Sequence, residues 1–215
     1  MTSARHVPRV TAAVLLAGLL ASGCATEEPG TPTPSSPTSN GESGTSAAGA
    51  DVPPVANPLD ASAYLDRPCD LVPQNVMDGL SYTEPGNALT AEENSTAALS
   101  GPGCGWNVRG RGQSVVVGIQ TGNQQDGIGG LQGIYDAYQD GQFEYYEPTT
   151  VGDYPAAFSD ISDKRDRGSC AMYVGIADDL TYSVYAGPYT DDPDEACPVA
   201  EQVAGAVIDT LKGGA

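Results

Sequence analysis

The sequence predicts an α+β domain in which a mainly antiparallel β-sheet packs with helices. Two pairs of strand-like segments, residues 104–108 with 113–120 and residues 169–177 with 180–186, are each joined by a short turn, as in β-hairpins. The chain ends in a long segment with the apolar period of an amphipathic helix. Because helical and strand segments follow each other along the chain, we expect helices to cover at least one face of the sheet.

The first predicted element, residues 60–79, is expected to be helical in pieces. Pro68 and Pro73 interrupt it, and each is acceptable in a first helical turn, where the missing N–H has no intrahelical partner to lose. Gly79 supplies a stop. Residues 83–103 are polar, acidic and small, and we expect a loop there with one strand.

The first hairpin turns at Arg109-Gly110-Arg111-Gly112, and the β-branched run Val115-Val116-Val117 favours a strand after it. Residues 121–130 are expected to form a glycine-rich loop, followed by a helix over residues 131–139. Further strands are expected at residues 143–146 and 154–158. A turn of mixed charge, residues 163–168, then leads into the second hairpin, which turns at Asp178-Asp179.

The last predicted element is a helix that ends near Lys212, with Gly213 as its stop. Its apolar stripe has a four-residue step and consists of Val199, Val203, Val207 and Leu211, with Ala200, Ala204 and Ile208 beside it. Asp192 can cap the start, but Pro198 would then break a backbone hydrogen bond. We therefore expect a short first turn, a kink, and the main helix from Pro198.

The amino-terminal region has the pattern of a bacterial lipoprotein signal. Arg5 and Arg9 precede an apolar stretch that is too short to span a bilayer, and Cys24 follows the small residues that mark a cleavage site. We expect residues 1–23 to be removed as a signal peptide, with a diacylglycerol on the Cys24 sulfur. The alternative is an ordinary secretory signal followed by an incidental cysteine.

Residues 24–58 would then carry the lipidated cysteine and a tether. Its residues 25–58 contain no aromatic side chain and are rich in Thr, Ser, Pro, Gly and Ala. Such a segment cannot bury enough apolar surface to offset the entropy of ordering, so we expect it to be disordered. Residues 59–215 would form a single domain on the outer face of the cell membrane.

The charge balance limits the partners of this domain. The signal contains two of the nine basic residues and no acidic one, which leaves 28 acidic against seven basic residues, a formal charge of −21. We expect no binding of nucleic acid, because phosphate binding relies on clustered Lys and Arg.

Four cysteines remain in the domain: Cys69, Cys104, Cys170 and Cys197. An even number in an exported domain indicates two disulfides, and three pairings are open. The sequence does not decide between them. We favour Cys69–Cys104 and Cys170–Cys197, because each bond would join a helix to a neighbouring strand.

Four segments carry a resemblance to a known family. They are Arg67-Pro68-Cys69-Asp70-Leu71, Gly103-Cys104-Gly105-Trp106, Gly152-Asp153-Tyr154-Pro155-Ala156, and the positions of Cys170 and Cys197. The chain resembles the actinobacterial lipoproteins called domain of unknown function three-five-five-eight. It departs from them at Arg67, where Asp is usual, and at Pro198. The resemblance implies a lipid-anchored α+β domain with two bridges, and the family has no established activity whose residues could be assigned here.

The residue inventory argues against most enzyme classes. His6 is the single histidine and lies in the predicted signal, which excludes Ser-His-Asp and Cys-His catalysis in the mature chain. We expect no catalytic residue, no cofactor and no metal site. The segment Asp191-Asp192-Pro193-Asp194-Glu195 lacks the alternation of a calcium loop, and its charge suits a helix start.

Two features suggest binding. Five of the seven basic residues lie at two predicted turns, where they would form an anion-binding patch if the turns share one end of the sheet: Arg109, Arg111, Lys164, Arg165 and Arg167. Tyrosines are frequent in the strand region, and Tyr182 and Tyr185 must face opposite sides of their strand. We expect an envelope domain that binds an envelope protein or a small ligand. The alternatives are an accessory subunit without its own ligand and a carboxylate-based hydrolase.

Overall fold

The structure, a computed structural model, describes residues 52–213. Its first elements are two short 3-10 helices, η1 (Ser62–Tyr64) and η2 (Pro68–Leu71), and the helix α1 (Gln74–Gly79). The prediction of an interrupted helical segment is confirmed. Pro68 opens η2 and Pro73 directly precedes α1, so each proline stands where its missing N–H has no helical partner.

The next segment contains one helix that was not predicted. Strand β1 (Asn87–Leu89) is followed by α2 (Ser95–Ser100), in a region expected to be a loop with one strand. Asn94 caps α2, and its side-chain oxygen accepts hydrogen bonds from the N–H groups of Thr96 and Ala97 at 2.9 and 3.0 Å. The predicted first hairpin is confirmed as β2 (Gly103–Asn107) and β3 (Ser114–Ile119).

The middle of the chain contains a second helix missed by the prediction. Residues 121–130, expected to be a loop, begin with the short helix α3 (Thr121–Gln125). The predicted helix over residues 131–139 is confirmed as α4 (Leu131–Gln139). The two strands that follow, β4 (Tyr145–Val151) and β5 (Tyr154–Asp160), form a hairpin that turns at Gly152.

The second predicted hairpin is confirmed as β6 (Cys170–Ala177) and β7 (Leu180–Gly187), preceded by η3 (Arg165–Arg167). The last helix, α5 (Ala196–Leu211), follows η4 (Pro193–Glu195). It begins two residues before the predicted start at Pro198. Pro198 is the third residue of α5 and lies in its first turn, where N–H groups need no intrahelical partner. The proline therefore breaks no bond there.

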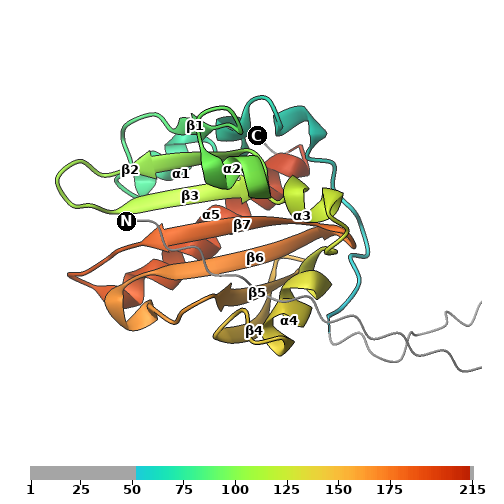
Figure 1. Cartoon of the computed structure of the whole chain (residues 1–215). Coiled ribbons are helices and arrows are strands. Elements are labelled where there is room, and N and C mark those ends of the chain that lie inside the picture. Colours follow the sequence, from blue (N-terminus) through green and yellow to red (C-terminus); the bar gives the residue numbers. More distant parts are fainter. Residues whose placement is uncertain (1–51, 214–215) are drawn as a thin grey trace, which may run out of the picture. The chain divides into compact units, whose positions relative to one another are not determined.

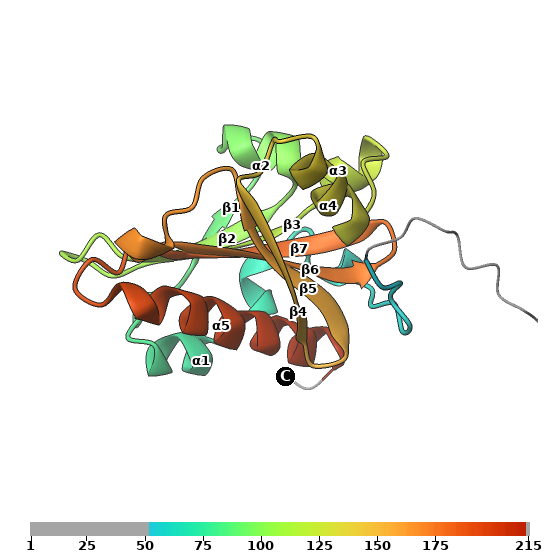
Figure 2. The same cartoon turned by 90° about the horizontal axis from the view of Figure 1, so that it is seen from below.

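All seven strands form one antiparallel sheet in the order β1-β2-β3-β7-β6-β5-β4 (Figure 1). The predicted α+β class with a mainly antiparallel sheet is confirmed. Seen along the sheet, α5 and α1 lie on one face, and α2, α3 and α4 lie on the other (Figure 2). The main core lies on the α5 face and contains the predicted stripe residues Val199, Val203 and Val207, all buried.

Two disulfides join helical segments to strands. Cys69 of η2 is bonded to Cys104 of β2, and Cys170 of β6 is bonded to Cys197 of α5. The favoured pairing is confirmed. Each bond fixes an element of the α5 face to the sheet, next to the main core.

The packing of the chain extends upstream of Leu59, the predicted first residue of the domain. Val52 and Val55 are buried, and the N–H of Val55 donates to the Asp178 carboxylate at 2.9 Å. Residues 52–58 therefore belong to the packed structure, although composition placed them in the tether. Cys24 and residues 1–51 lie outside the described residues. Among residues 52–213, no helix has the length and hydropathy needed to cross a membrane.

Candidate functional site

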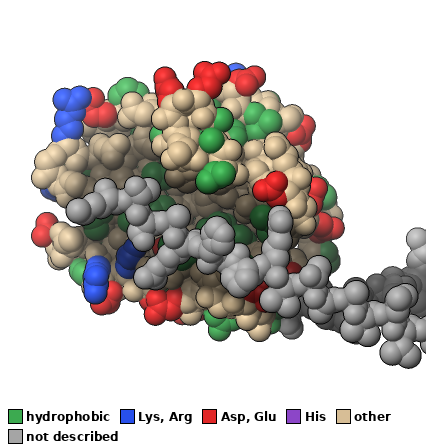
Figure 3. All heavy atoms as spheres, viewed as in Figure 1, with side chains coloured by type: hydrophobic (Ala, Val, Ile, Leu, Met, Phe, Trp, Pro, Cys, Tyr) green, Lys and Arg blue, Asp and Glu red, His purple; other side chains and the backbone are tan. Residues whose placement is uncertain are grey.

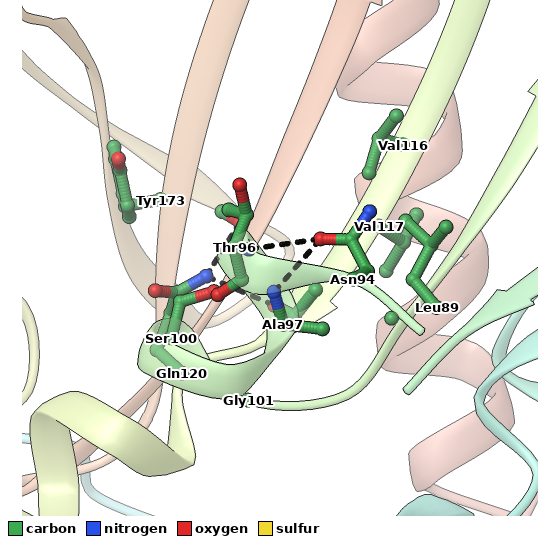
Figure 4. A pocket seen from close by; sticks show the side chains of 13 residues that line it. Leu89, Asn94, Thr96, Ala97, Ser100, Gly101, Val116, Val117, Gln120 and Tyr173 are labelled. Carbon is green, nitrogen blue, oxygen red and sulfur yellow. Dashed lines mark hydrogen bonds between the residues drawn. The ribbon is translucent and has the colours of Figure 1, made fainter. Parts of the chain in front are cut away.

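A cavity of about 410 Å³ lies on the sheet face opposite α5, between α2 and strand β6 (Figure 4). We call it the α2 cavity; residues from α2, β3, β6 and β7 line it, among them Ala97, Val116, Gly118, Tyr173 and Ser183. Its volume falls within the range of about 300–1,000 Å³ that is usual for small-molecule sites.

The floor of the α2 cavity is shaped by glycine on strand β3. A Cβ at Gly118 would lie 3.4 Å from Gln120 Nε2 and 3.5 Å from Ser183 Oγ, which is close to ordinary contact. The backbone there is also not in the left-handed region. Gly118 is therefore not required by the fold, and its missing side chain leaves the space open. Glycine inside a strand often marks a place where another group approaches the backbone closely.

Helix α2 forms one wall, and α3 holds it in place. A Cβ at Gly122 of α3 would lie 1.7 Å from the Leu99 carbonyl oxygen of α2, so the two helices approach as closely as only glycine permits. On the cavity side, the Ser100 hydroxyl donates to the Thr96 carbonyl at 2.9 Å. The wall is thus fixed by its cap, by an internal hydrogen bond and by contact with α3.

Three polar side chains lie around the floor. The amide nitrogen of the buried Gln120 donates to the Ser183 hydroxyl at 2.8 Å. Tyr173 faces α2 from the other side of the cavity (Figure 4). Burial, and secondly the charge of Asp160, raise the pKa of Tyr173 to about 12. Its phenol is therefore neutral at physiological pH and can donate or accept a hydrogen bond.

Among residues 52–213, no charged side chain lines the α2 cavity. This is unusual in a chain with 28 acidic and nine basic residues. A second cavity, of about 490 Å³, is lined partly by Asp66 and Glu92, and a third, of about 360 Å³, by Asp60. The α2 cavity therefore differs from both in chemistry, because its groups are neutral and several are held by hydrogen bonds.

The predicted basic residues share one end of the sheet but do not form one patch. Ser114 of β3 pairs with Gly187 of β7, and Cys170 of β6 pairs with Ala186, so both turns lie at this end. In the space-filling view, basic side chains occupy two separate places there, each beside acidic ones (Figure 3).

Arg165 is already engaged within the protein. Its guanidinium bonds to Asp163 at 2.6 Å and to Glu147 at 2.7 Å, and it lies 4.2 Å from the ring centroid of Tyr145. The hydrogen bond with Arg165 lowers the pKa of Asp163. Arg109 is near Glu84 at 3.6 Å. Arg111, Lys164 and Arg167 are exposed, and anion binding by them stays a prediction.

The tyrosines divide between the two faces as strand alternation predicts. Tyr182 is buried, and its hydroxyl donates to the Ala204 carbonyl of α5 at 2.8 Å. Tyr185 is half-buried and donates to the Ser169 hydroxyl at 3.1 Å. On the second face, Tyr146 of β4 contacts Tyr135 and Tyr138 of α4, with ring centroids 5.2 and 6.1 Å apart.

The carboxylates give no support to acid–base chemistry at the α2 cavity. Hydrogen bonds lower the pKa values of the Asp60 and Asp163 carboxyl groups, because they favour the charged form. A general acid of a glycosidase needs the opposite shift. Within residues 52–213, no cluster of His, Cys, Asp or Glu could hold a metal ion.

Fold and bonding together define a disulfide-bridged α+β domain built on one seven-stranded antiparallel sheet. The chain belongs to the family described as Protein of unknown function (DUF3558), whose model matches residues 19–210. No curated protein and no solved structure matches the chain. Two of the segments that carry the resemblance, around Cys69 and Cys104, are joined by the first disulfide.

Sequence reasoning missed the α2 cavity, although part of its signal was present. Asn94 followed by a run of small helix-compatible residues is the pattern of a capped helix. Gln120 and Ser183 carry no local pattern. They meet because β3 and β7 are neighbours, and Gly118 pairs with Ser183 in that register.

Proposed function

We propose that the chain is a lipid-anchored cell-envelope protein whose extracytoplasmic domain binds a ligand in the α2 cavity. The observation that carries the proposal is the cavity itself. Its lining within residues 52–213 carries no charged side chain in an acidic chain, and Gln120 and Ser183 are joined there by a hydrogen bond. Its partners would be the membrane, through the anchor, and an envelope component. Nucleic acid is not among them, because the chain is strongly acidic.

The anchor rests on the sequence around Cys24. We expect the mature protein from its host to begin at Cys24 and to carry the mass of a diacylglycerol. A Cys24→Ala variant should be released from the membrane fraction, because it lacks the sulfur that would carry the acyl chains. Mature protein that begins downstream of Cys24 without lipid mass would contradict the anchor.

The two alternatives receive less support from the site. An accessory subunit without its own ligand needs no open cavity, and Gly118 would then be replaceable by a larger residue without effect. A carboxylate-based hydrolase needs two acidic side chains at the ligand, whereas none of the described residues that line the α2 cavity is acidic. A binding domain needs only an open cavity with hydrogen-bonding groups, and the α2 cavity provides both.

Crosslinking in the native envelope tests the proposal. A photoreactive amino acid at Thr96, which is exposed and lines the α2 cavity, should capture an envelope component that mass spectrometry can identify. The same group at Asp209, exposed on α5 across the sheet, serves as the matched control. Equal capture from both positions, or none from Thr96, would remove the support for a binding cavity.

A further inference from the structure

The α2 cavity presents both donors and acceptors that the described residues leave open. The Ser183 hydroxyl accepts from Gln120 and has its own hydrogen left to donate. Gln120 Oε1 and the Tyr173 hydroxyl make no hydrogen bond within residues 52–213. Beside these groups, Leu89, Ala97 and Val116 supply apolar surface. The cavity is thus polar at its floor and apolar along one side.

Three ligand chemistries fit this arrangement poorly. Among the described lining residues, a carboxylate or phosphate would meet no cation, inside a chain of formal charge −19, and an ammonium group would meet no carboxylate. An acyl chain would cover Ser183 and Tyr173 without satisfying their hydroxyls. An extended peptide that adds to a sheet needs a free edge, but β3 is paired on both sides, by β2 and β7.

We propose that the α2 cavity binds an uncharged, polyhydroxylated ligand, with the chemistry of a neutral sugar ring. This assignment rests on the proposed function and names its ligand class. Sugar hydroxyls both donate and accept, and so match Ser183, Gln120 and Tyr173. The C–H surface of a sugar ring matches the apolar side at Leu89 and Val116. The flat floor at Gly118 gives the ring access to these groups.

The test is a titration of the ¹⁵N-labelled full chain followed by NMR. The probes are neutral trisaccharides of glucose, galactose and arabinose, with trigalacturonate and the trimer of glucosamine as charged counterparts. We expect at least one neutral trisaccharide to shift the amide signals of Gly118, Gln120 and Ser183 in a saturable way. The charged counterparts should bind at least about tenfold more weakly.

Two variants locate the binding. Gly118→Val places a side chain on the floor and should abolish saturable shifts. Ser183→Ala removes one hydroxyl and should weaken binding about five- to tenfold. Ser62→Ala, on η1 outside the α2 cavity, is the matched control and should bind as the parent does. The melting temperature of each variant shows whether it folds. If Gly118→Val does not fold, Ser183→Ala still tests the binding.

Failure of this proposal can be told apart from failure of the proposed function. If no neutral trisaccharide binds, if charged ones bind equally well, or if Ser183→Ala and Gly118→Val leave binding unchanged, the ligand class is wrong. Capture from Thr96 in the envelope would then still support a binding cavity. If Thr96 captures nothing, the proposed function itself falls.

Discussion

Two tyrosine hydroxyls meet inside the main core. Tyr82, downstream of α1, and Tyr189, downstream of β7, are 1% and 4% exposed, and their oxygens lie 2.8 Å apart. Each hydroxyl group therefore has a hydrogen-bond partner in a part of the core that water does not reach. This contact joins segments that are 107 residues apart in sequence.

A double-mutant cycle should show that the pair acts as a unit. Tyr82→Phe leaves the Tyr189 hydroxyl buried without a partner, and we expect a loss of about 1–3 kcal/mol in the free energy of unfolding. Tyr82→Phe with Tyr189→Phe should cost less than the sum of the single changes, because no orphaned hydroxyl remains. Urea denaturation of the four proteins measures this. Additive losses would mean that the hydrogen bond contributes nothing.

The same burial predicts sensitivity to alkaline pH. Burial raises the pKa values of Tyr82, Tyr182 and Tyr189 above 10. Because the folded state holds these protons more tightly, their stabilising contribution is complete below about pH 10 and is lost as the pH rises further. Each tyrosine should lower the free energy of unfolding by up to about 1.4 kcal/mol per pH unit in that range.

Urea midpoints between pH 8.5 and 11 measure this effect. In Tyr182→Phe the urea midpoint should fall less steeply with pH, because the variant has one buried titrating group fewer. Tyr64→Phe, at a half-buried position outside the sheet, provides the comparison. An equal decline in the parent and in Tyr182→Phe would contradict the assignment of the effect to buried phenols.

At the scale of elements, long periodic segments were predictable and short ones were not. The two predicted hairpins, β2–β3 and β6–β7, and the helices α4 and α5 carry turn residues or apolar periods that extend over whole elements. Helices α2 and α3 have six and five residues, too few to show a period, and each depends on contacts with the other. Tertiary packing at Gly122, rather than local preference, positions them.

A matched pair of glycine substitutions tests this contact. Gly205→Ala in α5 has no atom within 4 Å of the new Cβ and should stabilise the protein by about 0.5–1 kcal/mol through helix propensity. Gly122→Ala makes the same change in α3 but meets the Leu99 carbonyl, and we expect a loss of about 1–3 kcal/mol. Thermal unfolding of both variants measures the difference.

The pair also links packing to the α2 cavity. Because Gly122→Ala moves the wall formed by α2, it should reduce capture from Thr96 in the envelope. Gly205→Ala should leave capture unchanged. Stabilisation by both substitutions would show that α2 and α3 can separate freely, and that the wall is not held as described.

At the scale of the whole molecule, the disulfides close loops between cysteines 35 and 27 residues apart. Loop entropy alone predicts that each bond contributes about 3–4 kcal/mol. We expect Cys69→Ala with Cys104→Ala to lower the free energy of unfolding by about that amount. Chemical denaturation measures it, and the Cys170→Ala with Cys197→Ala protein is the comparison. No change in either protein would contradict the entropic account.

The fold was more predictable than the site for a physical reason. The two predicted hairpins and the helix stripe depend on local residue spacing, and they indicated an antiparallel sheet covered by a helix. The cysteine count indicated two bridges, but the pairing came from the structure. The α2 cavity depends on strand register and on a short helix, since Gln120 and Ser183 are 63 residues apart and belong to no motif. The sequence left open whether the basic turns share one end of the sheet, and the strand register shows that they do. The engagement of Arg165 with Glu147 likewise required the folded structure.

Strand β4 forms one edge of the sheet and contains Pro148 at its centre. Proline has no N–H to offer an incoming strand, and an edge strand is the place in a sheet that tolerates it. At the opposite edge, β1 is only three residues long. Neighbouring copies of the domain would therefore find few free backbone N–H and C=O groups to pair with at these two strands. We expect the domain to form no edge-to-edge fibrils at high local concentration.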